Sequence, residues 1–270
     1  MNSLKPMGLL ASGRMNDSTL LRVPQLGPAF GPIVASSKRL ASRYANTLRL
    51  GYPAASLEAF KQCTIVWIQA PAAELGELQL ALLRSSILWR RKTVVLIDPD
   101  LDCASLAPLA AQGAAVASLT HAPLLRENTL LVEGDEAALR ALRPIWRSSG
   151  ARALELKAGL KQVYTAGLMA SVSLTSTIVD GAVSCLRTAG LDQAMAKRLT
   201  GAMVETAVRQ QLTHGRKSWA SPACEARREL TLRQIEALRM FDPPLACYLR
   251  NVLAAALRWY GEPREWLGPV

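Results

Sequence analysis

The sequence predicts an α/β N-terminal domain built on a parallel β-sheet, followed by an all-α C-terminal domain. Its 270 residues exceed the roughly 100 to 200 of a typical domain, so two domains are expected. In the first half, short apolar runs alternate with helical patterns, which is typical of successive β-α units. From Leu160 onward, glycine and proline become rare and apolar residues recur at helical spacing. We therefore assign residues 1–156 to the first domain and 157–270 to the second.

Strands are predicted where a short, β-branched apolar run ends at a turn residue. The clearest is Thr64–Ala70, which reads TIVWIQA and is closed by Pro71. Thr93–Ile97 reads TVVLI and stops at the turn sequence Asp98-Pro99-Asp100. The other predicted strands are Met7–Ala11, Gly31–Ala35, Ala115–Leu119, Thr129–Val132 and Ala153–Leu156.

Helices are predicted between the strands and throughout the second domain. In the first domain they cover Ser37–Ala45, Ala72–Leu88, Cys103–Gln112 and Asp135–Ser148. In the second they cover Lys161–Ala189, Asp192–Thr213, Leu230–Met240 and Pro243–Tyr260. The first of these four lacks a broad charged face. We expect it to be buried on most sides, inside the domain or against a second subunit, which predicts a homodimer formed through the C-terminal helices.

Composition indicates a globular, cytoplasmic protein. The N-terminal residues carry only a short apolar run without the cleavage site of a secretory signal. No apolar run approaches the roughly 20 residues of a membrane span, so we expect no membrane partner. The five cysteines are widely spaced and none forms a CxxC pair, which indicates reduced thiols and no metal site.

The formal net charge of +11 raises the question of a nucleic-acid partner. The densest basic cluster is Arg84, Arg90, Arg91 and Lys92, and it contains one aromatic residue, Trp89. Aromatic residues make up only 5% of the chain, and no nucleic-acid-binding signature is present. We expect a solvated basic face rather than a nucleic-acid site. Part of the charge could instead attract an anionic ligand such as a dinucleotide phosphate.

A degenerate glycine motif follows the first predicted strand. A Rossmann fingerprint places G-x-G-x-x-G there, because glycines allow the tight turn and the close approach of the backbone to a pyrophosphate. Here the stretch reads Ala11-Ser12-Gly13-Arg14-Met15-Asn16, and only the middle glycine is present. If a dinucleotide binds, we expect Ala11, Gly13, Arg14 and Met15 to contact it.

The end of the second predicted strand favours NADP over NAD as the cofactor. NAD enzymes usually carry an acidic residue there, whereas this chain has Ser36, Ser37, Lys38 and Arg39, whose hydroxyls and cations suit a 2′-phosphate. Ala70 and Pro71 end the next strand at the same edge and complete the predicted cofactor site. Alternatively, the cations simply solvate the start of a helix.

With this domain order, the sequence resembles a family of Rossmann-like proteins with a C-terminal helical domain of unknown function, related to pyrroline-5-carboxylate reductase and deazaflavin-dependent NADP oxidoreductases. The matching parts are TIVWIQAP (64–71), SLAPLAAQGAAVASLTHAP (105–123), VEGDEAALRAL (132–142) and KQVYTAGLMASVSL (161–174). The chain departs from the family pattern in two places. Thr165 and Ser173 stand where the family has a histidine and an asparagine, and Asp98-Pro99-Asp100-Leu101 replaces a His-x-Ser-Gly turn.

A reductase of this layout needs one proton donor beside the nicotinamide. Lys161 and Thr165 lie one helical turn apart, flanked by Tyr164, on the helix expected to border the interdomain cleft. A desolvated lysine can donate a proton near neutral pH. His121, just after a predicted strand, is a further candidate. The alternative is that Lys161 is solvated, that Tyr164 packs as an ordinary aromatic and that His121 lies outside the cleft.

The sequence therefore predicts an NADP-dependent reductase of a small carbonyl or imine substrate. The main alternative is a non-catalytic Rossmann protein with a ligand-binding, regulatory or scaffolding role, favoured by the lost glycines. A third is a basic scaffold for nucleic acid or an acidic partner. The substrate is not specified by any motif, because its contacts depend on tertiary geometry.

Overall fold

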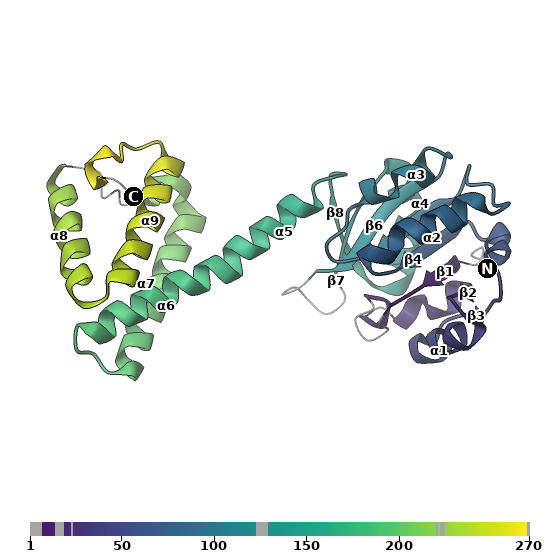
Figure 1. Cartoon of the computed structure of the whole chain (residues 1–270), viewed down its shortest axis with the longest axis horizontal. Helices are drawn as coiled ribbons and strands as arrows, with labels where there is room; N and C mark the ends of the chain where they lie inside the picture. Colours follow the sequence, from purple (N-terminus) through teal and green to yellow (C-terminus); the bar gives the residue numbers. More distant parts are fainter. Residues whose placement is uncertain are drawn as a thin grey trace. The chain divides into compact units, whose positions relative to one another are not determined.

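The fold is described from a computed structural model covering residues 7–13, 19–22, 24–122, 129–219, 221 and 225–268. The chain divides into two compact units, Met1–Gly167 and Leu168–Val270 (Figure 1). The predicted division after Leu156 would place all of the following helix in the second unit. By contacts, the start of that helix belongs to the first unit.

The first unit contains an eight-stranded sheet of order β3-β2-β1-β4-β5-β6-β7-β8. β1 to β6 run parallel, β7 is antiparallel to β6, and β8 is parallel to β7. The connection from β6 to β7 is too short for a crossover helix, so the chain reverses direction there. The predicted α/β class is confirmed, with a sheet that is mostly rather than wholly parallel. The strands are Met7–Ala11 (β1), Phe30–Val34 (β2), Tyr52–Pro53 (β3), Ile65–Gln69 (β4), Thr93–Ile97 (β5), Ala115–His121 (β6), Thr129–Gly134 (β7) and Arg152–Leu156 (β8).

Each face of the sheet has its own apolar core, because successive strand side chains point to opposite faces. Leu9 belongs to one core and Leu10 to the other. The first core packs against α1 (Lys38–Leu48) and α4 (Glu136–Ser149). The second packs against α2 (Ala72–Arg84), α3 (Ala107–Ala110) and two 3-10 turns, η3 (Leu57–Gln62) and η4 (Cys103–Leu106).

Several elements of the first unit differ from the prediction. α2 ends at Arg84 rather than Leu88. The chain that follows is extended, and its alternate residues Ile87 and Trp89 are buried in the core. The predicted helix Cys103–Gln112 is a 3-10 turn followed by the single turn α3, which has a proline at its start. β3 and η3 have no counterpart in the prediction, since both are too short to show a period.

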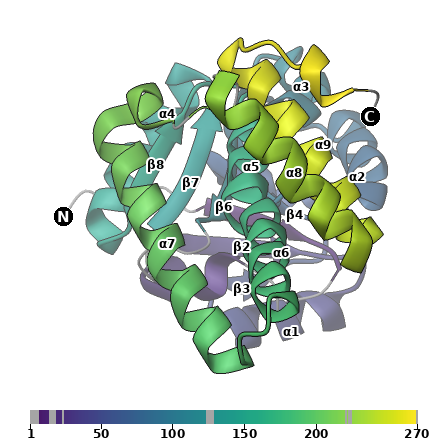
Figure 2. The same cartoon turned by 90° about the vertical axis from the view of Figure 1, so that its left-hand side faces the viewer.

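The second unit is helical, as predicted. Figures 1 and 2 show α6 alongside α7 and α8 alongside α9. α5 leads into this unit through the π-helical turn η5. The helical elements from Lys161 onward are α5 (Lys161–Met169), η5 (Ala170–Leu174), α6 (Thr175–Thr188), α7 (Gln193–His214), η6 (Gly215–Ser218), α8 (Glu225–Phe241), α9 (Pro243–Tyr260) and η7 (Glu265–Leu267).

The continuous helical segment Lys161–Thr188 is far more exposed than the sequence predicts. Only 6% of its most apolar window is buried within this chain, so burial inside the domain is wrong. The expected burial against a second subunit stays a prediction. By length and composition alone, this 28-residue segment could also cross a membrane, a test that core helices of soluble proteins pass as well.

Candidate functional site

The carboxyl edge of the sheet carries the first candidate site. In open α/β sheets, ligands bind outside the carboxyl ends of the strands where the strand order reverses, here between β1 and β4. A cavity of about 460 Å³ opens at the ends of β1 and β2. It is lined by Leu10, Ala11, Ser12, Val34, Ala35, Ser36, Ala55, Ser56, Leu57, Glu74, Glu77 and Leu78.

The loop after β1 is fixed by contacts with α1 and α2. Gly13 has a φ of +78°, and a Cβ there would lie 2.8 Å from Pro71 Cγ, so only glycine fits. The buried Tyr44 hydroxyl donates to the Gly13 carbonyl at 2.8 Å. Ser12 N donates to Gln69 O at 2.8 Å. Two predicted cofactor residues, Gly13 and Pro71, are therefore brought together at this edge.

Acidic side chains line the same cavity. Glu74 lies in the first turn of α2 and accepts a hydrogen bond from the Ser12 hydroxyl, and Glu77 also faces the cavity. Burial, followed by the nearby Glu74 charge, raises the pKa of Tyr44. Carboxylates at this position disfavour a pyrophosphate close to Ser12.

In its described part, residues 12–13, 19–22 and 24–29, the connection from β1 to β2 differs from that of a dinucleotide fold. Such folds place an α-helix there, and its N-terminus binds the pyrophosphate. In the described part of this connection, only the 3-10 turns η1 (Thr19–Arg22) and η2 (Pro24–Ala29) occur. Arg14 and Met15 lie outside the described residues. The described part of this connection therefore offers no α-helix N-terminus that could bind the pyrophosphate of a dinucleotide.

The end of β2 is better suited to an anion. Ser36 lines the cavity, and Ser37 caps α1 by accepting from Leu40 N at 3.2 Å. Lys38 and Arg39 are the first residues of α1 and are exposed. Within the residues described, neither forms an ion pair. Two exposed cations at the start of a helix, with no ion pair among the described residues, favour a bound phosphate.

Lys161 begins α5 and is 1% exposed. Its ammonium donates to the carbonyls of Asp98 and Leu101, the latter at 2.8 Å, and to the Ser118 hydroxyl at 3.1 Å. All three ammonium protons are thereby engaged. Burial lowers the pKa of Lys161, and the charges of Asp98 and Glu133 oppose that shift.

A buried carboxylate completes this network. Glu133 on β7 is 1% exposed and accepts from Cys103 N at 2.6 Å, Gly159 N at 2.6 Å and the Ser118 hydroxyl at 3.1 Å. Ser118 thus links the buried ammonium of Lys161 to a buried carboxylate. This arrangement ties the start of α5 to β6 and β7.

The remaining predicted catalytic residues are only partly brought together. Tyr164 and Thr165 are half-buried on α5, and Thr165 Oγ1 donates to Lys161 O at 3.1 Å. In the part of the chain that is described, the Tyr164 hydroxyl has no hydrogen-bond partner. His121 ends β6 at the same edge, but the strand alternation places it on the opposite face from Ser118. The structure therefore separates His121 from Lys161.

Tyr44, Glu74 and Glu133 also contribute to this region, and the sequence does not predict them there. Glu74 had a usable signal, an acidic residue three positions after Pro71 at the start of a helix. Tyr44 had none, because an aromatic residue on the apolar face of a helix is expected simply to pack. Glu133 stands in an apolar strand, and only the tertiary structure shows its partners.

Residues 129–236 match the family model described as Domain of unknown function (DUF2520). This range covers the last part of the sheet and the first part of the helical unit, which confirms the resemblance stated above. None of the curated protein sequences matches the chain.

Solved structures with the same fold extend the likeness over nearly the whole chain. A candidate NADP oxidoreductase from Bacteroides fragilis has a TM-score of 0.68 at 11% identity, covering 96% of this chain and 99% of that one. An imine reductase from Myxococcus stipitatus in complex with NAD⁺ has a TM-score of 0.65 at 16% identity, covering 94% of each chain. An imine reductase from Aspergillus terreus with a reduced NADP cofactor has a TM-score of 0.58 at 14% identity, covering 97% and 89%. At these identities the likeness shows the fold.

Proposed function

We propose that this chain is an NADP-dependent oxidoreductase that reduces a small carbonyl or imine compound. The observation that carries the proposal is the cavity of about 460 Å³ at the carboxyl ends of β1 and β2, with Ser36 in its wall and Lys38 and Arg39 following at the start of α1. The fold shared with NADP oxidoreductases and imine reductases supports it.

The residues present suit one half of the cofactor. Ser36, Lys38 and Arg39 would hold the 2′-phosphate, and Gly13 would leave room for the backbone to approach the ligand. When bound, NADPH supplies a hydride to the substrate carbon. The pyrophosphate half would lie near Glu74, which repels it.

The proton-donating role fits Tyr164 better than Lys161. Lys161 is buried with its three protons engaged, so it acts as a positioning residue that holds α5 to the sheet. Tyr164 is half-buried and would present a phenol one turn along the same helix. Tyr164→Phe should then lower kcat while NADPH binding is unchanged.

The first test is a titration with NADPH and, separately, NADH, followed by nicotinamide fluorescence and by the thermal midpoint. The Lys38→Glu and Arg39→Glu variants should each weaken NADPH binding at least about tenfold and leave NADH nearly unchanged, since a charged hydrogen bond contributes roughly 1.5–3 kcal/mol. Arg147→Glu, an equal charge change at an exposed position of α4, is the matched control. Glu74→Gln should tighten both nucleotides by removing the repulsive charge.

A non-catalytic, ligand-binding protein is the second candidate function. It is favoured by the 3-10 turns between β1 and β2 and by the acidic residues in the cavity. Absence of saturable binding of either nucleotide would overturn the reductase proposal and leave this one.

We also propose that the helical unit pairs with a second copy of the chain. Among its described residues, its core cluster holds three buried side chains, those of Ala254, Leu257 and Leu267. Apolar side chains along α5, η5 and α6 are exposed, among them Met169, Val172, Leu174 and Ile178. An apolar surface of this extent on a small helical unit is typical of an obligate interface. The small-molecule substrate and the cytoplasmic location stay predictions.

A further inference from the structure

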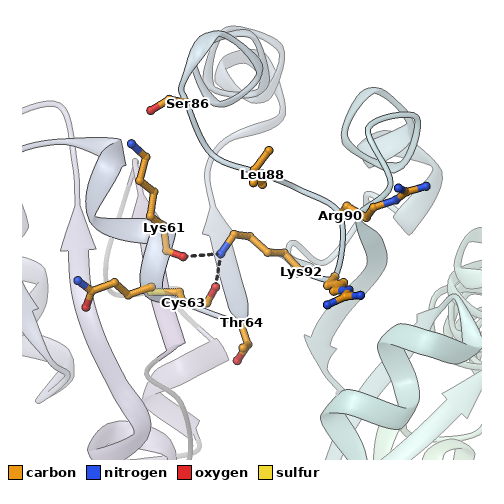
Figure 3. A pocket seen from close by; sticks show the side chains of 9 residues that line it. Lys61, Cys63, Thr64, Ser86, Leu88, Arg90 and Lys92 are labelled. Atoms are coloured by element: carbon orange, nitrogen blue, oxygen red, sulfur yellow. Dashed lines mark hydrogen bonds between the residues drawn. The ribbon is translucent and has the colours of Figure 1, made fainter.

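A second cavity, of about 690 Å³, lies at the amino edge of the sheet (Figure 3). Thr64 and Lys92 line it, and they directly precede β4 and β5. Because these strands are parallel, this edge is opposite to the carboxyl edge discussed above. The two cavities are therefore separate sites.

The segment between α2 and β5 shapes this cavity. Ile87 and Trp89 are buried in the core, so the residues between and around them, Ser86, Leu88 and Arg90, face outward. The Lys92 ammonium donates to the carbonyls of Phe60, Lys61 and Cys63 at the end of η3, at 3.1 Å and 2.9 Å for the first two. Lys92 thereby fixes one end of the segment against η3.

Glu58 fixes the other end. Its carboxylate accepts from Ser86 N at 3.2 Å and from Ser86 Oγ at 2.5 Å, and it forms an ion pair with Lys61 at 2.5 Å. Hydrogen bonds from Lys61 and Ser86 lower the pKa of Glu58 to about 2. The cavity wall is therefore held on both sides before any ligand arrives.

The cavity has an excess of positive charge. Its lining includes Lys61, Arg90, Arg91 and Lys92, and Figure 3 shows Lys92 between Lys61 and Arg90. Glu58 neutralises Lys61, and Lys92 is directed at backbone carbonyls. Arg90 and Arg91 are exposed, and within the described residues neither guanidinium forms an ion pair.

Arg91 also occupies a strained backbone position. Lys92 N donates to Trp89 O at 2.9 Å, which closes a four-residue turn with Arg90 and Arg91 at its centre. Arg91 has a φ of +72° and Arg90 does not have a positive φ, which defines a type II turn, where glycine is usual at the third position. An arginine in such a position carries a backbone cost that glycine would not, and Arg49 at the end of α1 carries the same kind of cost.

We propose that this cavity binds a small phosphorylated anion, with the guanidinium groups of Arg90 and Arg91 contacting its phosphate oxygens. Guanidinium forks match phosphate oxygens in pairs, and the cavity volume lies in the range of small-molecule sites. A nucleic-acid surface is disfavoured because Trp89, the aromatic residue of the basic cluster, is buried and cannot stack on bases.

The test is calorimetric titration of the full chain with inorganic pyrophosphate at about 50 mM salt, where screening is limited. Arg91→Gly should weaken binding at least tenfold and, by removing the strain, raise the thermal midpoint by about 2 °C. Arg49→Gly is the matched control. Arg49 also has a positive φ, at the end of α1, so this variant should raise the midpoint with no change in affinity.

Two further variants separate the cavity from general surface charge. Arg84→Ala removes an equal charge from the neighbouring end of α2, outside the cavity, and should change the affinity less than twofold. Arg147→Glu, at an exposed position of α4 outside the cavity, should also leave pyrophosphate affinity unchanged. The proposal is overturned by no saturable binding at millimolar pyrophosphate, by unchanged affinity in Arg91→Gly, or by equal losses in either control. Tight binding of a single-stranded oligonucleotide that pyrophosphate does not displace would also overturn it.

Discussion

The two units of the chain bury their apolar residues to very different extents. In the sheet unit, each face of the sheet carries a buried apolar core. In one of these cores the Trp67 ring packs against the rings of Phe30 and Trp146, with centroids 5.7 and 5.9 Å apart. In the part of the helical unit that the structure describes, the core cluster has three buried residues. The exposed large apolar side chains of this unit include Met169, Val172, Leu174, Ile178, Leu199, Met203, Val208, Leu212, Met240, Phe241 and Trp259.

The difference has a physical cause. The crossover connections between parallel strands place helices on both faces of the sheet, so helices of the same chain cover the strands on both sides. A bundle buries only the stripe of each helix that meets a neighbour, and these helices carry apolar residues outside that stripe. Both faces of the sheet unit are therefore covered by its own helices, whereas the helical unit leaves many of its apolar side chains exposed.

The largest expected effect is on the sheet core. Trp67 is fully buried, and its indole N–H donates to Met7 Sδ at 3.3 Å. Trp67→Ala should lower the free energy of unfolding by about 3–5 kcal/mol in urea denaturation. In the helical unit, Met203 is 67% exposed, and Met203→Ala should lower the free energy of unfolding of the monomer by less than about 0.5 kcal/mol. A small loss for Trp67→Ala would contradict the contrast between the units.

The second expected effect tests the pairing of the helical unit. Leu174 and Leu80 are almost equally exposed, at 50% and 52%, but lie in different units. Leu174→Glu should raise the dimer Kd about a thousandfold, or ~4 kcal/mol, because it buries a carboxylate in an apolar interface. Leu80→Glu should leave the dimer intact. Light scattering over a concentration series measures both, and a monomeric native protein would refute the pairing.

A third effect concerns a thiol of the sheet unit. Burial, followed by the Glu133 charge, raises the pKa of Cys103 from 9.0 to about 11. Because the folded value is above the unfolded one, this contribution to stability is complete below pH 9 and is lost as the pH rises through 11. Relative to the Cys103→Ala variant, the free energy of unfolding of the native chain should fall by about 2–3 kcal/mol between pH 9 and pH 11. Parallel stability curves for the two proteins would contradict the shift.

The smallest effect is a difference in labelling rates. Cys63 and Cys103 of the sheet unit are buried, whereas Cys247 of the helical unit is exposed and Cys185 is half-buried. Among these four cysteines, a thiol reagent at pH 8 should modify Cys247 first and leave Cys63 and Cys103 unmodified until the protein unfolds. Peptide mapping after a short reaction checks this order. Early labelling of Cys103 would show that the sheet unit opens more readily than its core indicates.

Much of the fold follows from local patterns. Met7–Ala11 and Thr93–Ile97 coincide with β1 and β5, since an apolar run bounded by turn residues specifies a buried strand without help from distant contacts. β3 and the end of α2 were not predicted, because a two-residue strand has no period and the core burial of Ile87 and Trp89 overrides helical propensity. At the carboxyl edge, the sequence points to Gly13, Ser36 and Lys161 as candidates but not to the nearby carboxylates of Glu74, Glu77 and Glu133.

By itself, the sequence determined the class of the fold, the order of sheet and helices, and the loss of the glycine motif, all of which depend on near neighbours in the chain. The tertiary structure decided which charges meet. Lys161, Ser118 and Glu133 are far apart in sequence yet share one buried network. It also placed Arg90 and Arg91 around a cavity at one edge of the sheet, and Lys38 and Arg39 at the other. Side-chain contacts of this kind depend on strand pairing and register, which no local pattern encodes.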